Sequence, residues 1–430
     1  MICNYKLKLM ENESGTTNNP FLKLNVQLFF LARFVRMFAY GSLSVLLVLY
    51  LAQLKLSEAK IGLLLTLTLA GDVAVSLLLT TTADRFGRRR TLAIGALLMF
   101  MAGIVFAMTN NFVVLLLAAT IGVISPSGNE VGPFLSVEQA GLSQVIPFNR
   151  RTNVFGWYNL TGSLATALGA LVSGAVVQAI RNAGASALDS YRVVIFGYAG
   201  TGVILTLLSL CLSGEVELPP NNTAPRMAGA RVFLGLHRSK GIVVKLSALF
   251  SLDAFAGGFI MQSIVAYWFH IRFGVQPATL GMIFFWANIL AAVSALTAAA
   301  MASRIGLIKT MVFTHLPSNV LVILVPLMPS MPLAVLMLLL RFSISQMDVP
   351  ARQSYVMAVV EPDERSAAAG ITAVARSVGA AVSPGISIML LGSMLMSLPF
   401  FIGGGLKIIY DLLLYRGFAA SRPPVESRPA

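Results

Sequence analysis

The sequence predicts an all-α integral membrane protein in which twelve transmembrane helices form two pseudo-symmetric six-helix halves. Composition, the spacing of apolar runs and an internal repeat support this fold. Of the 430 residues, 57% are hydrophobic and only 11% are charged, whereas a soluble domain carries about 25% charged residues. The mean hydropathy is +0.81, and no soluble core needs that much apolar surface. The composition therefore indicates a membrane protein.

Twelve segments are long and apolar enough to cross a bilayer, which takes about 20 mostly apolar residues. They are 27–51, 60–82, 91–109, 112–136, 154–180, 193–213, 243–269, 278–302, 307–328, 331–355, 366–395 and 398–416. The segment 214–242 has the composition of a flexible, solvated linker and divides the spans six and six. The predicted organisation is an N-terminal tail (1–26), a first half (27–213), this linker, a second half (243–416) and a C-terminal tail (417–430).

The distribution of basic residues predicts the orientation. With the N-terminus inside, and with basic residues near a span end counted with the adjoining side, 21 of the 31 lysine and arginine residues fall on the cytoplasmic side, 5 fall on the opposite side and 5 lie deep within spans. This bias predicts that both termini are cytoplasmic. It also accounts for the net charge of +14 without a nucleic-acid partner.

The two halves share a sequence pattern at an offset of 214 residues. In each half, a glutamine near the end of one span is followed by a basic loop and a glycine-rich span. The matching pairs are Gln139 and Gln353, Arg151 and Arg365, and Gly156 and Gly370. A parallel repeat joined by a linker is therefore expected.

A short, strongly basic turn connects the second and third spans. It reads Asp-Arg-Phe-Gly-Arg-Arg-Arg over residues 84–90. This turn resembles the signature loop of the major facilitator superfamily, whose members are membrane carriers with twelve helices in two halves. The first position of the family pattern is usually glycine and is Thr80 here. A weaker second-half copy at 303–309 carries Ser303 in place of the acid.

The resemblance implies that this turn acts in the transport cycle. Asp84 would lie at the N-terminal end of the eleventh helix, where the helix dipole favours an anion. Arg88 would reach an acid at the foot of the fourth span, and Glu138 is the candidate. Together with Arg85 and Gly87, these residues form a predicted cytoplasmic gating motif, which would latch the halves together while the central site opens outward.

Charged residues within the spans are the candidates for a transport pathway, because each costs roughly 2.5–3.5 kcal/mol to insert. The predicted substrate or proton pathway consists of Arg36, Asp72, Glu130, Asp253, Arg341 and Arg376. Asp72 lies near the midplane and is interpreted as a proton-titrating carboxylate or as an ion-pair partner of Arg36. Asp253 is interpreted as a pathway residue or as a partner of Arg376 or Arg341.

Glu130 lies in the fourth span, which is predicted to be locally irregular. Helix-breaking residues surround it at Pro126, Gly128, Gly132 and Pro133, and backbone freed in this way can line a polar pathway. Glu130 is interpreted either as a coupling acid or as a partner of Arg33. Arg33 is expected to extend to the cytoplasmic face.

Two further pairs of charges are spaced four residues apart and are predicted to be local ion pairs. These are Asp348 with Arg352 in the tenth span and Lys407 with Asp411 in the last span. His315 in the ninth span is interpreted as a packed, hydrogen-bonded histidine in preference to the alternative, a proton relay.

No motif for an enzyme or for a cofactor occurs in the sequence. It has no phosphate loop, no metal-ligand spacing and no Ser-His-Asp arrangement. Cys3 and Cys211 are not expected to form a disulfide. The predicted protein is therefore not an enzyme, and neither a cofactor nor a metal is expected.

The function implied by the resemblance is secondary active transport of a small organic solute by alternating access. The absence of a nucleotide-binding motif favours coupling to protons. The nearly balanced charge within the spans leans slightly toward an anionic or zwitterionic solute. A multidrug or toxic-compound efflux carrier, an uncoupled facilitator and a transporter-like membrane sensor remain as alternatives. The expected location is the plasma membrane, and the expected state is a monomer.

Overall fold

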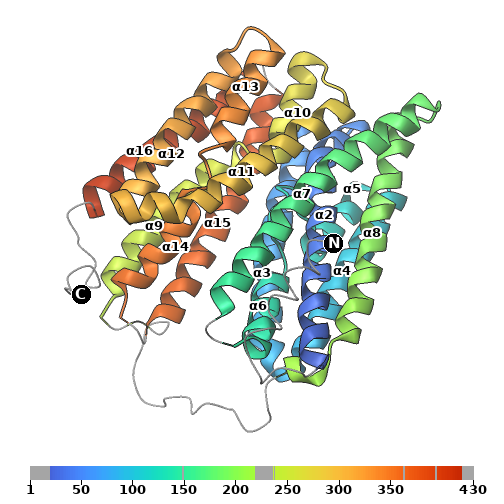
Figure 1. The fold of residues 1–430 in the computed structure, drawn as a ribbon. Helices are drawn as coiled ribbons and strands as arrows, with labels where there is room; N and C mark the ends of the chain where they lie inside the picture. The colour runs from blue at the N-terminus through green and yellow to red at the C-terminus, as the bar shows by residue number, and fades with distance from the viewer. Residues whose placement is uncertain are drawn as a thin grey trace.

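The computed structural model describes residues 20–147, 150–217, 236, 238–361, 364–392 and 395–418. Most of the predicted linker and the greater part of both predicted tails lie outside these residues. The described residues form two helical bundles that lie side by side, one for each half of the chain (Figure 1).

The first bundle begins with a long helix that is largely buried against its neighbours. Its elements are α2 (Pro20–Gln53), α3 (Glu58–Phe86), α4 (Arg88–Met108), α5 (Phe112–Ile121), α6 (Phe134–Val145), α7 (Arg151–Asn182), α8 (Ala187–Cys211) and the 3₁₀ turn η2 (Gly214–Val216). Helix α2 packs on α7 and α8, and α4 packs on α8. Leucines and large aromatic residues fill the space between them, with Tyr40, Tyr50 and Tyr158 fully buried.

The second bundle repeats this plan. Its elements are α9 (Lys240–Gly258), α10 (Gln262–Phe273), α11 (Pro277–Ile305), α12 (Leu307–Leu324), η3 (Val325–Leu327), α13 (Met331–Phe342), α14 (Asp348–Val359), α15 (Arg365–Leu391) and α16 (Leu398–Phe418). Ten segments of the described chain are long and apolar enough to cross a membrane. The pairs α5–α6 and α13–α14 supply the fourth and tenth crossings, so the predicted twelve-helix fold is confirmed.

Three of the crossings are interrupted. The fourth is broken over residues 122–133, the seventh between α9 and α10, and the tenth between α13 and α14. The break in the fourth span agrees with its predicted irregularity, and Gly128 (φ +74°) and Gly132 (φ +78°) adopt backbone angles that favour glycine. The breaks in the seventh and tenth spans were not predicted.

The halves meet at the end of the molecule remote from the linker. There, α7 packs on α11, and α3 packs on α15. The backbones approach closely: a Cβ on Gly281 would lie 2.6 Å from the carbonyl oxygen of Ala170, and one on Gly62 would lie 2.7 Å from that of Gly385. Small residues are needed for such contacts between membrane helices.

Toward the opposite end, where α8 stops and α9 starts, the halves diverge (Figure 1). A Cβ on Gly156 of α7 or on Gly370 of α15 would meet no atom within 4 Å. These two glycines are one of the pairs matched by the sequence repeat, so the corresponding stretch is uncrowded in both halves. The halves are thus in contact at one end and apart at the other.

The glycine contact between α7 and α11 provides a test of this arrangement. We expect Gly281→Ala to loosen the contact, because its methyl group would displace the backbone of α7. A Ser44→Cys reporter in a background without Cys3 and Cys211 should then react with a maleimide at least threefold faster, since Ser44 is buried beneath this end. The matched control Gly370→Ala should leave the rate unchanged, and equal rates in the two variants would contradict the proposed contact.

Candidate functional site

A single carboxylate joins four helices at the centre of the second half. Asp253 of α9 accepts hydrogen bonds from Lys407 Nζ of α16 at 2.5 Å, from Arg376 Nη1 of α15 at 3.0 Å and from Arg352 Nη1 of α14 at 3.3 Å. The side chain of Asp253 is 4% exposed, and those of Arg352 and Lys407 are 8% and 9% exposed. Three cations therefore compete for one buried anion.

The neighbouring acids neutralise part of this excess of positive charge. Arg352 also donates to Asp348 Oδ2 at 3.1 Å, so the predicted local pair of α14 is confirmed. The predicted pair of Lys407 with Asp411 is wrong, because Lys407 reaches across to Asp253. Asp411 instead lies 2.9 Å from His315 Nδ1, so the expected hydrogen bonding of the histidine is confirmed.

The sequence named Arg376 and Arg341 as alternative ion-pair partners of Asp253. In the structure, Arg376 forms the ion pair. The side chain of Arg376 is 32% exposed, in contrast to the other two cations. Arg376 is thus the most accessible of the three cations bound to Asp253.

A second cluster holds α2, α6, α7 and the broken fourth crossing together. Arg36 donates to both oxygens of Glu138 at 2.6 and 2.7 Å and to Glu130 Oε1 at 2.7 Å. Arg33 donates to Glu130 Oε2, and the Tyr158 hydroxyl donates to Glu138. Two guanidinium groups thus balance two carboxylates, and the fork-to-fork geometry of the Arg36–Glu138 pair is that of a strong ion pair.

This cluster corrects two predictions. Arg36 does not pair with Asp72, because Glu138 and Glu130 already bind its guanidinium group. Arg33 is 6% exposed and does not extend to the cytoplasmic face, because its partner Glu130 lies beside it inside the bundle. The interpretation of Glu130 as a partner of Arg33 is confirmed.

Asp72 of α3 contacts the broken fourth crossing instead of a cation. Its Oδ1 accepts a hydrogen bond from the backbone N–H of Gly132 at 2.6 Å and from Ser76 Oγ at 3.3 Å. The residue is partly buried. Within the described part of the chain, the carboxylate forms no ion pair. Asp72 is therefore a membrane carboxylate that is free to bind a proton or a cation.

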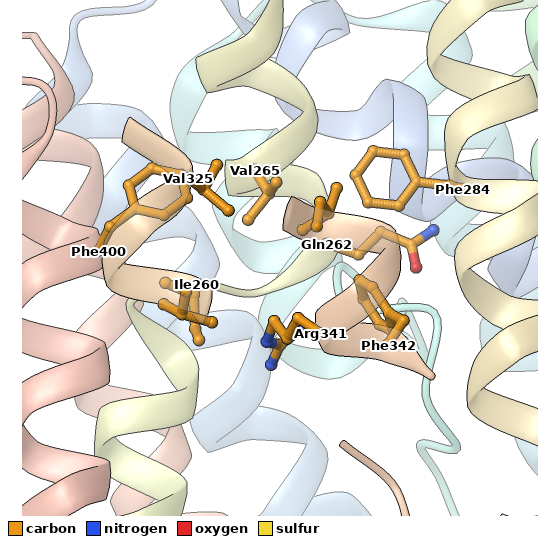
Figure 2. A pocket seen from close by; sticks show the side chains of 10 residues that line it. Ile260, Gln262, Val265, Phe284, Val325, Arg341, Phe342 and Phe400 are labelled. Carbon is orange, nitrogen blue, oxygen red and sulfur yellow. The ribbon is translucent and has the colours of Figure 1, made fainter. Parts of the chain in front are cut away.

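Arg341 lies in a pocket where two interrupted crossings of the second half come together. The pocket is lined by Ile260, Gln262, Val265, Phe284, Val322, Val325, Leu338, Arg341, Phe342 and Phe400 (Figure 2). Ile260 lies in the break of the seventh crossing, Gln262 is the first residue of α10, and Arg341 precedes the break of the tenth crossing. Among the described residues, the guanidinium group has no hydrogen-bond or ion-pair partner, and its Nε is buried.

Gln262 connects this pocket to the other half of the molecule. Its Nε2 donates to Ser44 Oγ of α2 at 2.8 Å, and its Oε1 accepts from Asn288 Nδ2 of α11 at 3.3 Å. The side chain that borders the pocket thus also forms a hydrogen bond across the contact between the halves.

The basic turn of the first half is held by an acid that follows α8. Glu217 accepts hydrogen bonds from the backbone N–H groups of Arg88 (2.7 Å) and Arg89 (3.1 Å) at the start of α4. An anion at this position is stabilised by the helix N-terminus. Gly87 makes the turn with φ +96°, and Arg85 is exposed.

The predicted contact of Arg88 with Glu138 needs correction. The Arg88 guanidinium donates to Gln144 Oε1 and to the carbonyl oxygen of Val216, both at 3.0 Å. Glu138 lies deeper, against Arg36, because the break in the fourth crossing moves α6 relative to a continuous helix. The side chain of Asp84 lies outside the described residues, so its place at the eleventh helix stays a prediction.

Sequence reasoning missed Lys407, Tyr158 and Glu217 as parts of these clusters. Lys407 was noticed as an unusual charge, but its partner is 154 residues away and depends on the packing of α16 on α9. Tyr158 has no sequence signal. Glu217 could have been found as an acid close to the basic linker, since a free helix N-terminus favours an anion.

Comparisons with known proteins agree on one family. The model of the Major Facilitator Superfamily matches residues 29–340. An uncharacterized membrane protein of Saccharomyces cerevisiae (strain ATCC 204508 / S288c) is 31% identical over 416 residues, which cover 91% of this chain and 93% of that protein.

Three solved structures share the fold at low sequence identity. A mutant of the nucleoside transporter NupG has a TM-score of 0.73 and 17% identity, covering 92% of this chain and 100% of that chain. A bacterial homologue of the human lysosomal transporter Spinster, in an inward-facing and occupied conformation, has a TM-score of 0.71 and 15% identity, covering 96% of this chain and 100% of that chain. A D-xylose–proton symporter has a TM-score of 0.69 and 15% identity, covering 92% of this chain and 96% of that chain.

The Asp253 cluster yields a prediction about stability. We expect Asp253→Asn to destabilise the protein by about 3–5 kcal/mol, because it leaves buried cations without their anion. The double variant Asp253→Asn/Lys407→Met should recover part of the loss by removing one of those cations. Thermal unfolding of the purified protein in detergent measures both effects.

The control for this prediction is Asp189→Asn, since the pair of Asp189 with Arg192 is exposed and exposed pairs contribute at most about 1 kcal/mol. A melting temperature of Asp253→Asn equal to that of the control would contradict a central role for Asp253. So would a double variant that is less stable than the single one.

Proposed function

The chain belongs to the major facilitator superfamily, and from this premise we propose that it is a secondary carrier of a small organic solute that works by alternating access. The observation that carries the proposal is the Arg341 guanidinium at the junction of two broken crossings, which lies over the Phe342 ring and, among the described residues, has no anionic partner. A cation inside a membrane protein is costly unless an anion neutralises it. The transported solute is proposed to supply that anion.

The two halves carry opposite unpaired charges. Among the residues that the structure describes, Asp72 of the first half has only neutral hydrogen-bond donors, and Arg341 of the second half has no hydrogen-bond acceptor. A solute with a carboxylate would bind to Arg341. Asp72 would take up either a proton or a basic group of the same solute, so this arrangement supports the expected anionic or zwitterionic substrate.

Closure at one end of the bundle supports alternating access. The glycine contacts of α7 with α11 and of α3 with α15 close the end remote from the linker. If the basic loops are cytoplasmic, this is an inward-facing state, like that of the bacterial Spinster homologue. Gln262 would couple the pocket to this closure, because a solute that bound its amide would compete with Ser44.

Proton coupling is the proposed energy source, and the fold is compatible with it, since one structural neighbour is a sugar–proton symporter. The proposed carrier acts as a monomer in the plasma membrane with both termini in the cytoplasm. Asp84, Arg85, Gly87 and Arg88 would latch the linker end in the outward-facing state. Glu217 would hold this turn in the present state.

A thermal-shift screen of the purified protein tests the substrate class. The solutes should include monocarboxylates, dicarboxylates, amino acids, sugars, nucleosides and organic cations. We expect solutes with a carboxylate to raise the melting temperature, because at 100-fold excess over the dissociation constant binding stabilises the folded state by about 2.7 kcal/mol. Arg341→Gln should abolish the shift.

The control is Arg272→Gln, which removes an exposed arginine at the end of α10 and should leave the shift intact. Uptake of the active solutes into proteoliposomes then measures transport. Stabilisation by organic cations alone, or an unchanged shift in Arg341→Gln, would rule out the anionic or zwitterionic substrate.

The role of Asp72 is tested separately. Because an amide cannot bind a proton, Asp72→Asn should weaken the acceleration of uptake by a proton gradient while keeping at least a third of the exchange rate between equal pools of solute. Proteoliposomes at several internal and external pH values provide the measurement. Full activity with an unchanged pH dependence would remove Asp72 as the coupling residue, and insensitivity of the wild type to a proton ionophore would favour an uncoupled facilitator.

A further inference from the structure

Behind the Asp253 cluster lies a buried histidine that the proposed function does not use. His315 of α12 is 5% exposed and lies between two carboxylates. Its Nδ1 is 2.9 Å from Asp411 Oδ1, and its Nε2 is 3.9 Å from Asp253 Oδ1. Asn319, one turn along α12, donates to Asp411 Oδ2 at 2.9 Å. The imidazole ring therefore bridges the acid of α16 and the acid of α9.

The neighbours determine which nitrogen carries the proton in the neutral ring. Nδ1 lies 2.9 Å from Asp411 Oδ1, an acceptor, and 3.2 Å from Asn319 Nδ2, a donor. We assign the proton to Nδ1, because the carboxylate is the nearer partner and hydrogen bonds to charged groups are the stronger ones. In the neutral ring, Nε2 is then an acceptor that faces another acceptor, Asp253 Oδ1, without a hydrogen bond. A proton added to Nε2 from water turns it into a donor aimed at Asp253.

This proton would bring a fourth cation to Asp253, at Oδ1, which Lys407 also binds, whereas Arg376 and Arg352 bind Oδ2. Lys407 and Arg352 are held in place by burial, and Arg352 has a second bond to Asp348. Arg376 is the exposed member of the cluster, with 32% of its side chain accessible. When an imidazolium group binds Asp253, Arg376 is therefore the cation that can leave at the lowest cost in desolvation.

We propose that His315 is a protonation site, and that uptake of a proton at its Nε2 releases Arg376 from Asp253 to bind an anionic group such as a carboxylate. Asp253 exchanges the Arg376 guanidinium for the His315 imidazolium, so the number of cations bound to Asp253 does not change. The cluster gains one positive charge, which the bound anion cancels. Proton and anion consequently bind together. The identification of that anion with the transported solute rests on the proposed function.

The charged and titratable groups around His315 come from several packed helices. They are Asp411, Lys407 and Tyr410 on α16, Asp253 on α9, Asp348 and Arg352 on α14, and Arg376 on α15. Arg341 on α13 interacts electrostatically with Asp253 and Asp348 and is a further cation outside the ion pairs at Asp253. With a neutral ring, the three cations bound at Asp253 are balanced by Asp253, Asp348 and Asp411. Protonation of the imidazole ring changes this balance by one charge.

The first experiment observes the ring directly. The chain has three histidines, so a His237→Asn/His270→Asn variant labelled with ¹⁵N-histidine reports on His315 alone. In detergent or nanodiscs, its ring nitrogen signals should move from the neutral Nδ1–H form to the imidazolium form between pH 8.5 and 5. A ring that stays neutral over this range, or that carries its neutral proton on Nε2, would overturn the proposal.

The second experiment follows Arg376. The protein is treated with phenylglyoxal at a series of pH values, and the modification of Arg376 is quantified by mass spectrometry relative to exposed Arg90 in the same sample. The ratio should rise at least threefold as the pH falls through the His315 midpoint. Buried Arg352 is the internal control and should not change.

The variant His315→Gln separates proton uptake from a general loosening of the protein. Its glutamine can still donate to Asp411 but cannot bind a proton, so the Arg376 ratio should become independent of pH. A rise of equal size in His315→Gln, or parallel rises at Arg352 and Arg376, would overturn the proposal. Neither experiment needs a transported solute, so these outcomes are distinguishable from a failure of the carrier function.

Discussion

The structure depends on one constraint: a charge placed among membrane helices must be neutralised by a partner on another helix. Water is not available there to solvate the ion, and a buried carboxylate that loses its counter-charge is strongly destabilising. Asp253 meets this constraint through bonds to α14, α15 and α16. Because one carboxylate holds all three helices, α16 through Oδ1 and α14 and α15 through Oδ2, the charge that is costly to bury also determines how the second half packs.

The first half meets the same constraint differently. Arg36 and Arg33 balance Glu138 and Glu130 one for one, and the bonds join α2 to the broken fourth crossing and to α6. This cluster is closed, since Arg36 is fully buried. The second-half cluster has more cations than its central acid can bind and extends to a partly exposed arginine. The pseudo-symmetric halves therefore share a fold while differing in electrostatics, so that one half is suited to hold its shape and the other to exchange partners.

Hydropathy was sufficient to predict the twelve crossings, because each crossing is a run of residues that are close together in the sequence. The residue types of both clusters were also recognised, since charges are rare in spans. Their partners were mostly not predicted. Arg36 with Glu138, and Lys407 with Asp253, are separated by 102 and 154 residues, and which side chains meet depends on helix rotation and on breaks that shift the register. Glu138 illustrates this, because a continuous fourth helix would place it near the basic turn.

The breaks explain why unpaired charges persist in this chain. Asp72 is held by the N–H of Gly132, which is available because the fourth crossing is not helical there. Arg341 lies next to a break in its own crossing and beside one in the seventh, where Gln262 also contacts the first half. A regular helix uses its own backbone groups, whereas an interrupted one offers them to a carboxylate, a side chain or a solute. The interruptions also allow the two parts of a crossing to move separately. Binding of a solute and movement of the halves would therefore use the same few residues, which is the physical basis for coupling one to the other.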